Sequence, residues 1–288
     1  MTKLLPLVVS IACCAAWPLA RAQTPALNPM PDGSRDMYVG LGAQSMPRYD
    51  GADSRKVSAL PVIQVEWSNG LFISGMRAGM HLSDSPSFEY GPLLAVLPGR
   101  DDSGTDGGAA GVTELNSLIL TSPIEKQRLA RGQGLAGMDE VRTRVQAGGF
   151  ANYYLTPQWR ITATALYGSG RERDGARLEL GVQRLAATLG ERHHVSLGAG
   201  LTVVNRKDNE TWFGVTREEA ARTFYNPYQP GGGLKDAHLD ARWTWAWTPS
   251  WILTSNLQAK RLLGSADKSP LVERSTNLTV STAIAYRF

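Results

Sequence analysis

The sequence has only two cysteines, Cys13 and Cys14, and both fall within its first 22 residues. Residues 1–22 fit a secretory signal peptide, because a basic Lys3 precedes an apolar run that ends in an Ala20-Arg21-Ala22 cleavage pattern. The alternative of lipidation at Cys13 is disfavoured, since the apolar run continues past it. Removal of this peptide would leave no thiol, which excludes disulfides, a cysteine nucleophile and a cysteine zinc site from the mature chain.

Long apolar runs are also missing beyond the signal peptide, where no stretch of eighteen apolar residues could form a transmembrane helix. Only helices and closed barrels satisfy every backbone hydrogen bond in lipid. An exported membrane protein of this composition must therefore be a closed β-barrel. The 30 glycines and 8 tryptophans of the 288-residue chain are compatible with that class.

A strong charge bias is absent too. The net charge is +4, and it falls to +2 if Lys3 and Arg21 leave with the signal peptide. Positive and negative residues are interspersed, and we find no basic run and no phosphate-binding glycine motif. These observations exclude nucleic acid as an expected partner.

Few side chains could perform catalysis. The chain has only 4 histidines, and no cysteine would remain after the signal peptide is removed. Only His81, beside Ser83, Asp84 and Ser85, forms a cluster that could be tested as a hydrolase site, and a Ser- and Asp-rich segment is more often a simple turn. His193-His194 has no acidic or histidine partner at metal-binding spacing. We therefore expect no enzymatic activity, no metal and no cofactor.

What the sequence does contain is clearest in residues 276–288, which alternate with a period of two. One face of this segment is mainly apolar and ends in Tyr286 and Phe288, whereas the other carries small and polar residues such as Ser281. A soluble edge strand rarely combines this length with two terminal aromatics. The ending resembles the last strand of bacterial outer-membrane β-barrels, so Tyr286 and Phe288 are the candidate assembly signal.

The same alternation recurs along the chain, and short turns alternate with longer loops, as in outer-membrane barrels with periplasmic turns and outer loops. Eleven strands can be recognised from the residues. They cover 36–44, 57–67, 71–82, 88–97, 140–155, 159–168, 176–189, 193–204, 236–248, 251–262 and 276–288.

An even number of strands is required, so we predict an all-β transmembrane antiparallel barrel of twelve strands, with ten as the alternative. The twelfth strand is expected at Val112–Thr121, inside the long segment 98–137. Residues 23–35 are expected to be a flexible periplasmic lead-in, and residues 36–288 a single barrel domain. Pro61 predicts a bulge or a strand end, and a phase shift predicts a bulge near Gln183-Arg184.

Several charged residues fall on the inward face of the predicted strands and could line an anion-favouring pore. Alternatively, they pair with one another across a filled lumen, which is the more usual arrangement in a small barrel. The candidate lumen-lining residues are Arg142, Arg144, Arg160, Glu179, Asp240, Arg242 and Lys260.

The long loop 205–235 is rich in aromatics and contains a short helical segment, Arg217–Arg222. Trp212, Phe213, Tyr225 and Tyr228 could contact a partner or ligand, although packing the loop down is the more frequent role of such residues.

Several short motifs follow one another along the chain in a recognisable order and spacing. They are Val39-Gly40-Leu41-Gly42-Ala43, Pro47-x-Tyr49-x-Gly51-x-Asp53, Leu60-Pro61-Val62, Phe213-Gly214-Val215-Thr216, Arg261-Leu262, Ser269-Pro270-Leu271-Val272 and Tyr286-Arg287-Phe288. Together they resemble the MltA-interacting protein / outer-membrane protein V (MipA/OmpV) family. The resemblance covers essentially all of the mature chain, and the segment 98–137 looks longer than the family pattern.

The resemblance implies residence in the bacterial outer membrane, in contact with its lipid. It also implies a scaffold that links a lytic transglycosylase to a peptidoglycan synthase in envelope maintenance. The inward arginines leave a second hypothesis open, a small-solute channel with weak anion preference.

Overall fold

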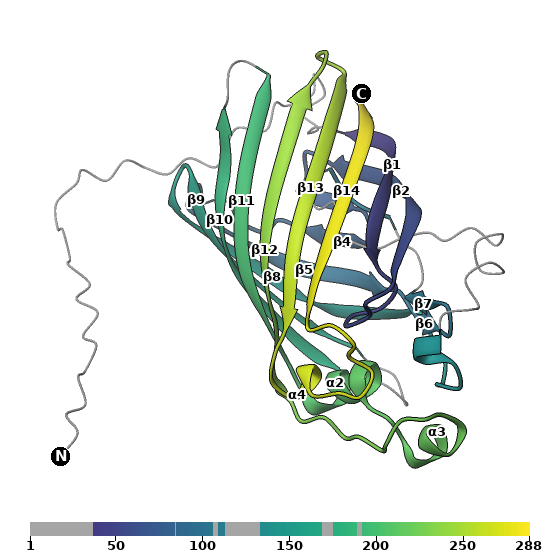
Figure 1. Cartoon of the computed structure of the whole chain (residues 1–288). Helices are drawn as coiled ribbons and strands as arrows, with labels where there is room; N and C mark the ends of the chain where they lie inside the picture. Colours follow the sequence, from purple (N-terminus) through teal and green to yellow (C-terminus); the bar gives the residue numbers. More distant parts are fainter. Residues whose placement is uncertain (1–36, 84, 106–108, 113–132, 169–174, 189–191) are drawn as a thin grey trace, which may run out of the picture.

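The computed structural model describes residues 37–83, 85–105, 109–112, 133–168, 175–188 and 192–288. The predicted signal peptide, the lead-in and most of the strand expected at Val112–Thr121 lie outside these ranges. In the described ranges twelve antiparallel strands close into a barrel, which confirms the predicted fold class and strand number (Figure 1). They are β1 (Tyr38–Pro47), β2 (Arg55–Glu66), β3 (Leu71–Ser74), β4 (Arg77–Met80), β5 (Phe88–Leu97), β8 (Arg144–Thr156), β9 (Trp159–Tyr167), β10 (Ala176–Thr188), β11 (His193–Val204), β12 (Gly233–Ala246), β13 (Trp251–Leu262) and β14 (Thr276–Arg287).

Short elements lie outside the barrel wall. β6 (Arg100–Asp101) and β7 (Gly104–Thr105) form a small hairpin, and a 3-10 turn covers Gln133–Leu135. Helices α2 (Arg206–Phe213), α3 (Arg217–Arg222) and α4 (Gly264–Asp267) gather at the end of the barrel opposite the C-terminus (Figure 1). We call this the cap end, and the end with the short connections the turn end. None of these helices is long and apolar enough to cross a membrane.

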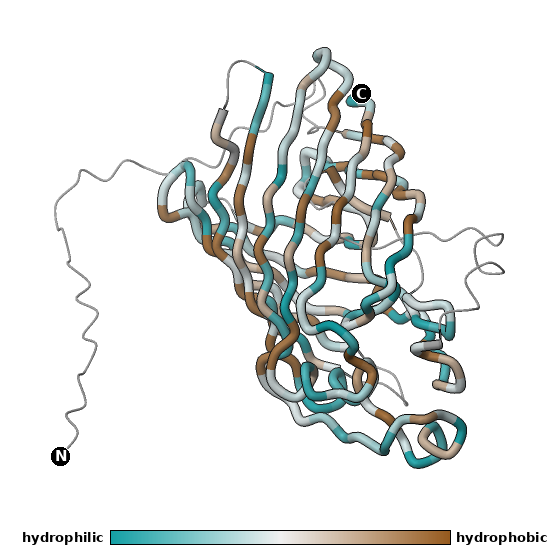
Figure 2. The backbone as a smooth tube through the Cα atoms, in the orientation of Figure 1, coloured by the Kyte–Doolittle hydropathy of each residue, from teal (hydrophilic) through white to brown (hydrophobic). Residues whose placement is uncertain are grey.

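The strands form because their residues alternate between two environments. In β14, Leu278, Val280 and Ile284 are 37–43% exposed on the outer face, whereas Ser281 and Ala283 on the inner face are at most 1% exposed. Hydrophobic and hydrophilic residues alternate in the same way along the other strands (Figure 2). The outer face is therefore apolar and unpaired with protein, while the inner face is enclosed by the barrel.

The ring closes where β1 pairs with β14, in a register that places Gly42 opposite Ala283. A Cβ atom at Gly42 would lie 2.3 Å from the Thr282 carbonyl oxygen, which is too close for any side chain. Gly40 has the same restriction against Ile284. These two glycines let the first and last strands approach each other, so they build the closing seam of the barrel.

The twelfth strand arises differently from the prediction. The single strand expected at 71–82 is split into β3 and β4, which pair as a short hairpin around Gly75 and Met76. A Cβ at Gly75 would meet the Ala109 carbonyl oxygen at 2.5 Å, so the segment 109–112 lies against the tip of the hairpin. In the barrel order β5 lies directly beside β8, and residues 113–121 of the expected strand lie outside the described residues.

Pro61 does not mark a bulge or a strand end, because it lies inside β2 and pairs in continuous register with Leu41 of β1. The opposite edge of β2 faces Ala110, which donates its N–H to the Pro61 carbonyl and accepts one from Ile63 N–H at 2.8 Å. β3 reaches only Gln64–Glu66. The missing N–H of Pro61 points to this edge, where no neighbouring strand requires it.

The phase shift in β10 is confirmed, since the pairing of β10 with β11 shifts register between Arg184 and Ala187. The helical segment predicted at Arg217–Arg222 is confirmed as α3 with the same bounds. Its start is set by a capping box, in which Thr216 accepts a hydrogen bond from Glu219 N–H while the Glu219 side chain accepts from Thr216 N–H.

Candidate functional site

A cavity of about 1080 Å³ occupies the barrel. It reaches Asp50 and Trp212 at the cap end, and Thr248 and Pro249 at the turn end. An apolar cluster fills the side of the lumen next to β1, β2 and β14, where Ala110 and Val112 pack against inward residues of these strands. The remaining lining combines charged and polar side chains with apolar ones such as Phe72, Leu93 and Phe150, so the cavity offers both hydrogen bonds and apolar contacts.

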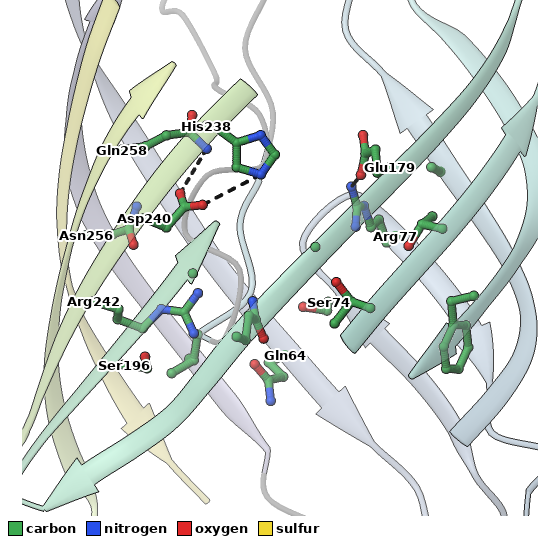
Figure 3. A pocket seen from close by; sticks show the side chains of 18 of the residues that line it. Gln64, Ser74, Arg77, Glu179, Ser196, His238, Asp240, Arg242, Asn256 and Gln258 are labelled. Carbon is green, nitrogen blue, oxygen red and sulfur yellow. Dashed lines mark hydrogen bonds and ion pairs between the residues drawn. The ribbon is translucent and has the colours of Figure 1, made fainter. Parts of the chain in front are cut away.

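An ion pair inside the barrel joins two parts of the wall that are not neighbours (Figure 3). Arg77 on β4 points toward Glu179 on β10, with Nη2 3.4 Å from Oε2. The Arg177 Nη1 atom lies 3.6 Å from the other oxygen of the same carboxylate. Glu179 is thus held by two guanidinium groups, and the pair narrows the cavity between its two ends.

Asp236, His238 and Asp240 of β12 form the next cluster, and Figure 3 shows His238 and Asp240 of it. His238 lies between two carboxylates, with Nδ1 3.5 Å from Asp236 and Nε2 3.7 Å from Asp240. Gly200 on β11 makes room for this imidazole, because a Cβ there would lie 2.5 Å from His238 Nε2. Asp240 also accepts a hydrogen bond from Gln258 Nε2 at 3.0 Å. No set of three or more metal-ligand side chains is arranged to hold a metal ion among the residues described.

Arg160 has a different environment near the turn end. Its Nε donates to Gln183 Oε1 at 2.8 Å, and its Nη1 lies 3.5 Å from the Tyr154 hydroxyl. Both partners are neutral. All three side chains line the cavity, and no carboxylate within the described ranges forms an ion pair with this guanidinium.

Helix α2 is held against the cap end of the barrel wall by a fully buried aspartate, Asp208. Three cations converge on it, with Arg144 Nη2 at 3.3 Å, Arg177 Nη2 at 3.7 Å and Lys235 Nζ at 3.8 Å. These cations come from β8, β10 and β12. Asp208 also lies in the first turn of α2, where its backbone N–H donates to the Asn205 cap and the helix dipole favours a negative charge. The carboxylate therefore fixes α2 to three strands of the wall.

The loops at this end form one packed unit, which we call the cap and define as residues 48–54, 133–139, 205–232 and 263–275. One apolar cluster joins Tyr49, Leu135, Val215 and Leu271 from all four segments. Backbone bonds connect 263–275 to 48–54, since the N–H groups of residues 273 and 274 both donate to the carbonyl of residue 51 at 2.8 Å. The cap is thus a folded structure that covers one mouth of the barrel.

The cap is also tied to the wall by charge. Asp50 of the cap pairs with Lys260 of β13. Burial by itself would raise the pKa of Asp50, but the nearby Lys260 and Lys235 outweigh it and hold that pKa below its ordinary value. The adjacent Tyr49 is 4% exposed, and burial together with Glu273 raises the pKa of its hydroxyl. Tyr49 therefore stays neutral at physiological pH, while Asp50 stays charged.

The predicted lumen residues fall into two groups. Arg142 is exposed and precedes β8, so it does not line the cavity, and Arg144 turns toward Asp208 in the cap. The others do line the cavity. They are Arg160, Glu179, Asp240, Arg242 and Lys260.

The sequence reasoning missed Arg77, Asp236, His238 and Asp208. The period of two in β12 already placed Asp236 and His238 on the face of Asp240, so pattern alone could have found them. Asp208 has no such signal, because it lies on a short loop helix whose docking depends on distant strands.

The loop aromatics pack within the cap. Phe213 is 1% exposed, so it is not available to a partner. The Tyr225 hydroxyl donates to the Gly134 carbonyl at 2.8 Å and the Tyr228 hydroxyl to the Ser265 carbonyl at 2.7 Å. Trp212 lies between two guanidinium groups, 5.9 Å from Arg100 and 5.3 Å from Arg144.

The cluster considered for hydrolysis contains Asp84, which lies outside the described residues. Its described members do not form a hydrolase site. Ser83 donates its hydroxyl to the Phe88 carbonyl, and no hydrogen bond joins Ser83 to His81. His81 instead packs beside Phe72 and Phe150, with its Nε2 atom 3.8 Å from Glu66.

The family comparison adds to this geometry. The family described as "MltA-interacting protein MipA" matches residues 39–288, which is most of the chain. The chain belongs to the MltA-interacting protein MipA family. Two relatives named MltA-interacting protein, from Escherichia coli (strain K12) and Shigella flexneri, are each 28% identical over 94 residues. Each match covers 33% of this chain and 38% of the relative, so it spans well under two thirds of the relative's length.

Solved structures similar to this MipA-family chain are outer-membrane proteins. The NanC porin has a TM-score of 0.46 at 9% identity, with coverage of 88% of this chain and 100% of the porin. The COG4313 outer membrane channel from Pseudomonas putida F1 has a TM-score of 0.43 at 9% identity, with coverage of 93% and 100%.

Three of the seven motifs that carry the MipA resemblance meet in the cap. Residues 47–53, 213–216 and 269–272 are far apart in sequence, but each supplies side chains to it. One direct link is the Ser269 hydroxyl, which donates to the Phe213 carbonyl at 2.7 Å. The other four motifs lie on or at the ends of the wall strands β1, β2, β13 and β14.

Proposed function

We propose that this chain is a non-enzymatic outer-membrane scaffold in cell-envelope maintenance. The observation that carries the proposal is the family match over residues 39–288, together with the name MltA-interacting protein of two relatives. In this proposal the apolar outer face contacts outer-membrane lipid, the cap end faces the outside and the turn end faces the periplasm. Export depends on the signal peptide at residues 1–22. The partners are a lytic transglycosylase and a peptidoglycan synthase.

The geometry supports a periplasmic site of action. The cap packs the outer mouth with buried residues such as Tyr49 and Phe213, whereas the cavity extends to Thr248 and Pro249 at the turn end. Partners in the periplasm would meet that end of the barrel.

Crosslinking of intact cells, followed by purification of the tagged chain and mass spectrometry, tests the scaffold. We expect enrichment of a lytic transglycosylase and of a peptidoglycan synthase over a tagged barrel of another family. Absence of both enzymes, in a sample that retains other envelope complexes, counts against the proposal.

A second candidate function is a small-solute channel with weak anion preference. The cavity of about 1080 Å³ and its inward Arg160, Arg242 and Lys260 support it. Planar-bilayer recording distinguishes the two functions, since a channel gives stepwise currents with greater anion than cation permeability. A pure barrel with no steps in several salts excludes the channel and leaves the scaffold intact.

A further inference from the structure

We propose that the cavity holds a binding site for an acidic saccharide, centred on Arg160 and reached from the periplasm. This inference rests on the proposed function for the side of access and for the source of the ligand, which would be cell-wall glycan. Its test uses the purified barrel alone, so it can fail or succeed independently of any protein partner.

The first observation is the state of Arg160. Neighbouring strands place Tyr154, Arg160 and Gln183 in one register row across β8, β9 and β10. The guanidinium is held by the two neutral neighbours at 3.5 and 2.8 Å, which fixes its position without cancelling its charge. A guanidinium has five N–H donors in a planar fork, so donors remain for a ligand carboxylate.

This distinguishes Arg160 from five of the cations treated above. Arg77 and Arg177 are engaged by Glu179, Arg144 and Lys235 by Asp208, and Lys260 by Asp50. At any of these cations, the carboxylate of a ligand in the lumen would have to compete with the acidic residue that already pairs with it. At Arg160 it would meet a guanidinium that is held by two neutral partners and forms no ion pair of its own within the described ranges. The Glu89 carboxylate lines the same cavity, but it is engaged by Asn152 and Tyr154.

The second observation is the wall beside Arg160. Asn152 and Thr162 form the next register row toward the cap, and Asn152 donates to Glu89 at 3.1 Å. These neutral groups offer hydrogen bonds to hydroxyl and amide groups. Residues two apart on one strand face are roughly 6.6 Å apart, so the rows are spaced to contact successive parts of one extended ligand.

The third observation is an aromatic cluster on the cap side of these rows, where Phe150 pairs with Thr164. The rings of Phe72, His81 and Phe150 lie 4.9–5.7 Å apart and line the cavity. A sugar ring presents C–H groups on its faces, which pack well against aromatic rings, and hydroxyl groups on its edge. Aromatic rings, neutral hydrogen-bonding groups and one fixed cation together match a carboxylate-bearing sugar better than a simple anion.

The side of access follows from the cap. Arg160 immediately follows the β8–β9 turn, so it lies near the turn end. Between it and the cap lies the Arg77–Glu179 pair, and beyond that the cap end is closed by buried residues. A ligand would therefore enter from the turn end, which faces the periplasm in the proposed function.

The test is a titration of the mature barrel in detergent, by isothermal calorimetry, with four probes. They are the disaccharide of N-acetylglucosamine and N-acetylmuramic acid, digalacturonic acid, the neutral N,N′-diacetylchitobiose, and inorganic phosphate. We expect the wild type to bind at least one acidic disaccharide saturably, and at least tenfold more tightly than diacetylchitobiose or phosphate. This comparison between ligands is made on the wild-type barrel alone, so it does not depend on whether a variant folds.

Two substitutions locate the site. Arg160→Gln removes the charge, and it should weaken the acidic disaccharide at least tenfold while leaving the neutral one unchanged. Phe150→Leu should weaken both disaccharides. Arg142→Gln is the matched control, because this arginine is exposed and outside the cavity, and it should bind like the wild type.

Each outcome is decisive. Equal binding of both acidic disaccharides supports an acidic saccharide as the ligand without identifying where it comes from. Preference for the muramic acid disaccharide supports cell-wall glycan as its source. No acidic binding at 10 mM, roughly the weak limit for a specific ligand, overturns the proposal. So does phosphate binding that equals the disaccharides, or an Arg160→Gln barrel that folds normally and binds like the wild type.

Discussion

Arg77 Nη2 lies 3.4 Å from Glu179 Oε2, although three strands of the barrel wall separate β4 from β10. Their side chains are 23% and 28% exposed, so water and salt screen the pair partly. Inside the lumen, the pair joins the short β3–β4 hairpin to the long strands. This part of the wall has few other connections, because β4 pairs with β5 through only three residue pairs.

A double-mutant cycle should detect this contact. Arg77→Ala, Glu179→Ala and the double variant should show a coupling energy of about 0.5–1 kcal/mol in urea unfolding, as expected for a partly screened ion pair. The coupling should decrease at 1 M salt. Additive effects within error would mean that the two side chains do not interact in the folded barrel.

Asp208→Asn should loosen the cap. The substitution keeps the shape of the side chain but removes the carboxylate on which Arg144, Arg177 and Lys235 converge, although Arg177 keeps another carboxylate partner, Glu179. The loss should cost about 3 kcal/mol. We expect faster hydrogen exchange and proteolysis in 205–232, measured by mass spectrometry. Glu210→Gln on the same helix is the control, since its pair with Arg206 is exposed and worth only about 0.3–0.5 kcal/mol. Equal effects of the two variants would refute the anchoring role.

Cap stability should depend on pH through Asp50. Its pKa is lower in the folded protein than the ordinary value of 3.8, so ionised Asp50 favours the folded cap above that value. The contribution should be lost as the pH falls below about 3.8 and through the folded pKa. The protection of 48–54 against hydrogen exchange, corrected for the intrinsic exchange rate at each pH, should therefore decrease in the wild type from pH 6 to pH 4 and pH 3. In Asp50→Asn this decrease should be smaller, and a decrease equal to that of the wild type would contradict the assignment.

Val280→Arg should destabilise the membrane-inserted barrel by about 2–4 kcal/mol, because Val280 is 40% exposed on the outer face of β14 and would face lipid. Ser281 is the inward neighbour that the alternating pattern offers as a control, but it is fully buried and has no room for arginine. Thr279 is a better control, since it lines the cavity. Folding in lipid vesicles, followed by gel mobility with and without heating, should show a larger loss for Val280→Arg than for Thr279→Arg.

Deletion of Phe288 should separate assembly from stability. Its side chain is half exposed, and its backbone N–H donates to the Met37 carbonyl at 3.1 Å, so folding in vitro should change little. The family resemblance implies that assembly machinery recognises the terminal aromatic. In cells we expect less heat-modifiable protein in the outer-membrane fraction and more unassembled protein. Normal assembly of the deletion variant in cells would show that Phe288 is not part of the assembly signal. An equal loss of folding in vitro would show that its role is structural.

The sequence alone determined the barrel class, most strand positions and the outward face, because a period of two is a local property of the chain. Val280, Ile284 and Tyr286 can be assigned to one face without any partner strand. The same holds for α3, whose capping box lies within four residues. The inward direction of Arg160 and Asp240 was equally local, whereas Arg142 was misplaced because the pattern continues beyond the actual start of β8 at Arg144.

Only the tertiary structure decided what the inward residues meet. Alternation places Arg77 and Glu179 on inner faces, but the curvature of the closed wall brings them together. The sequence pattern of 71–82 did not reveal the break at Gly75, where φ is +57° and the carbonyl of the distant Ala109 leaves no room for a Cβ. Asp208 becomes a structural anchor because three separate strands deliver their cations to one point. Such contacts join residues that are distant in sequence, so no local pattern records them.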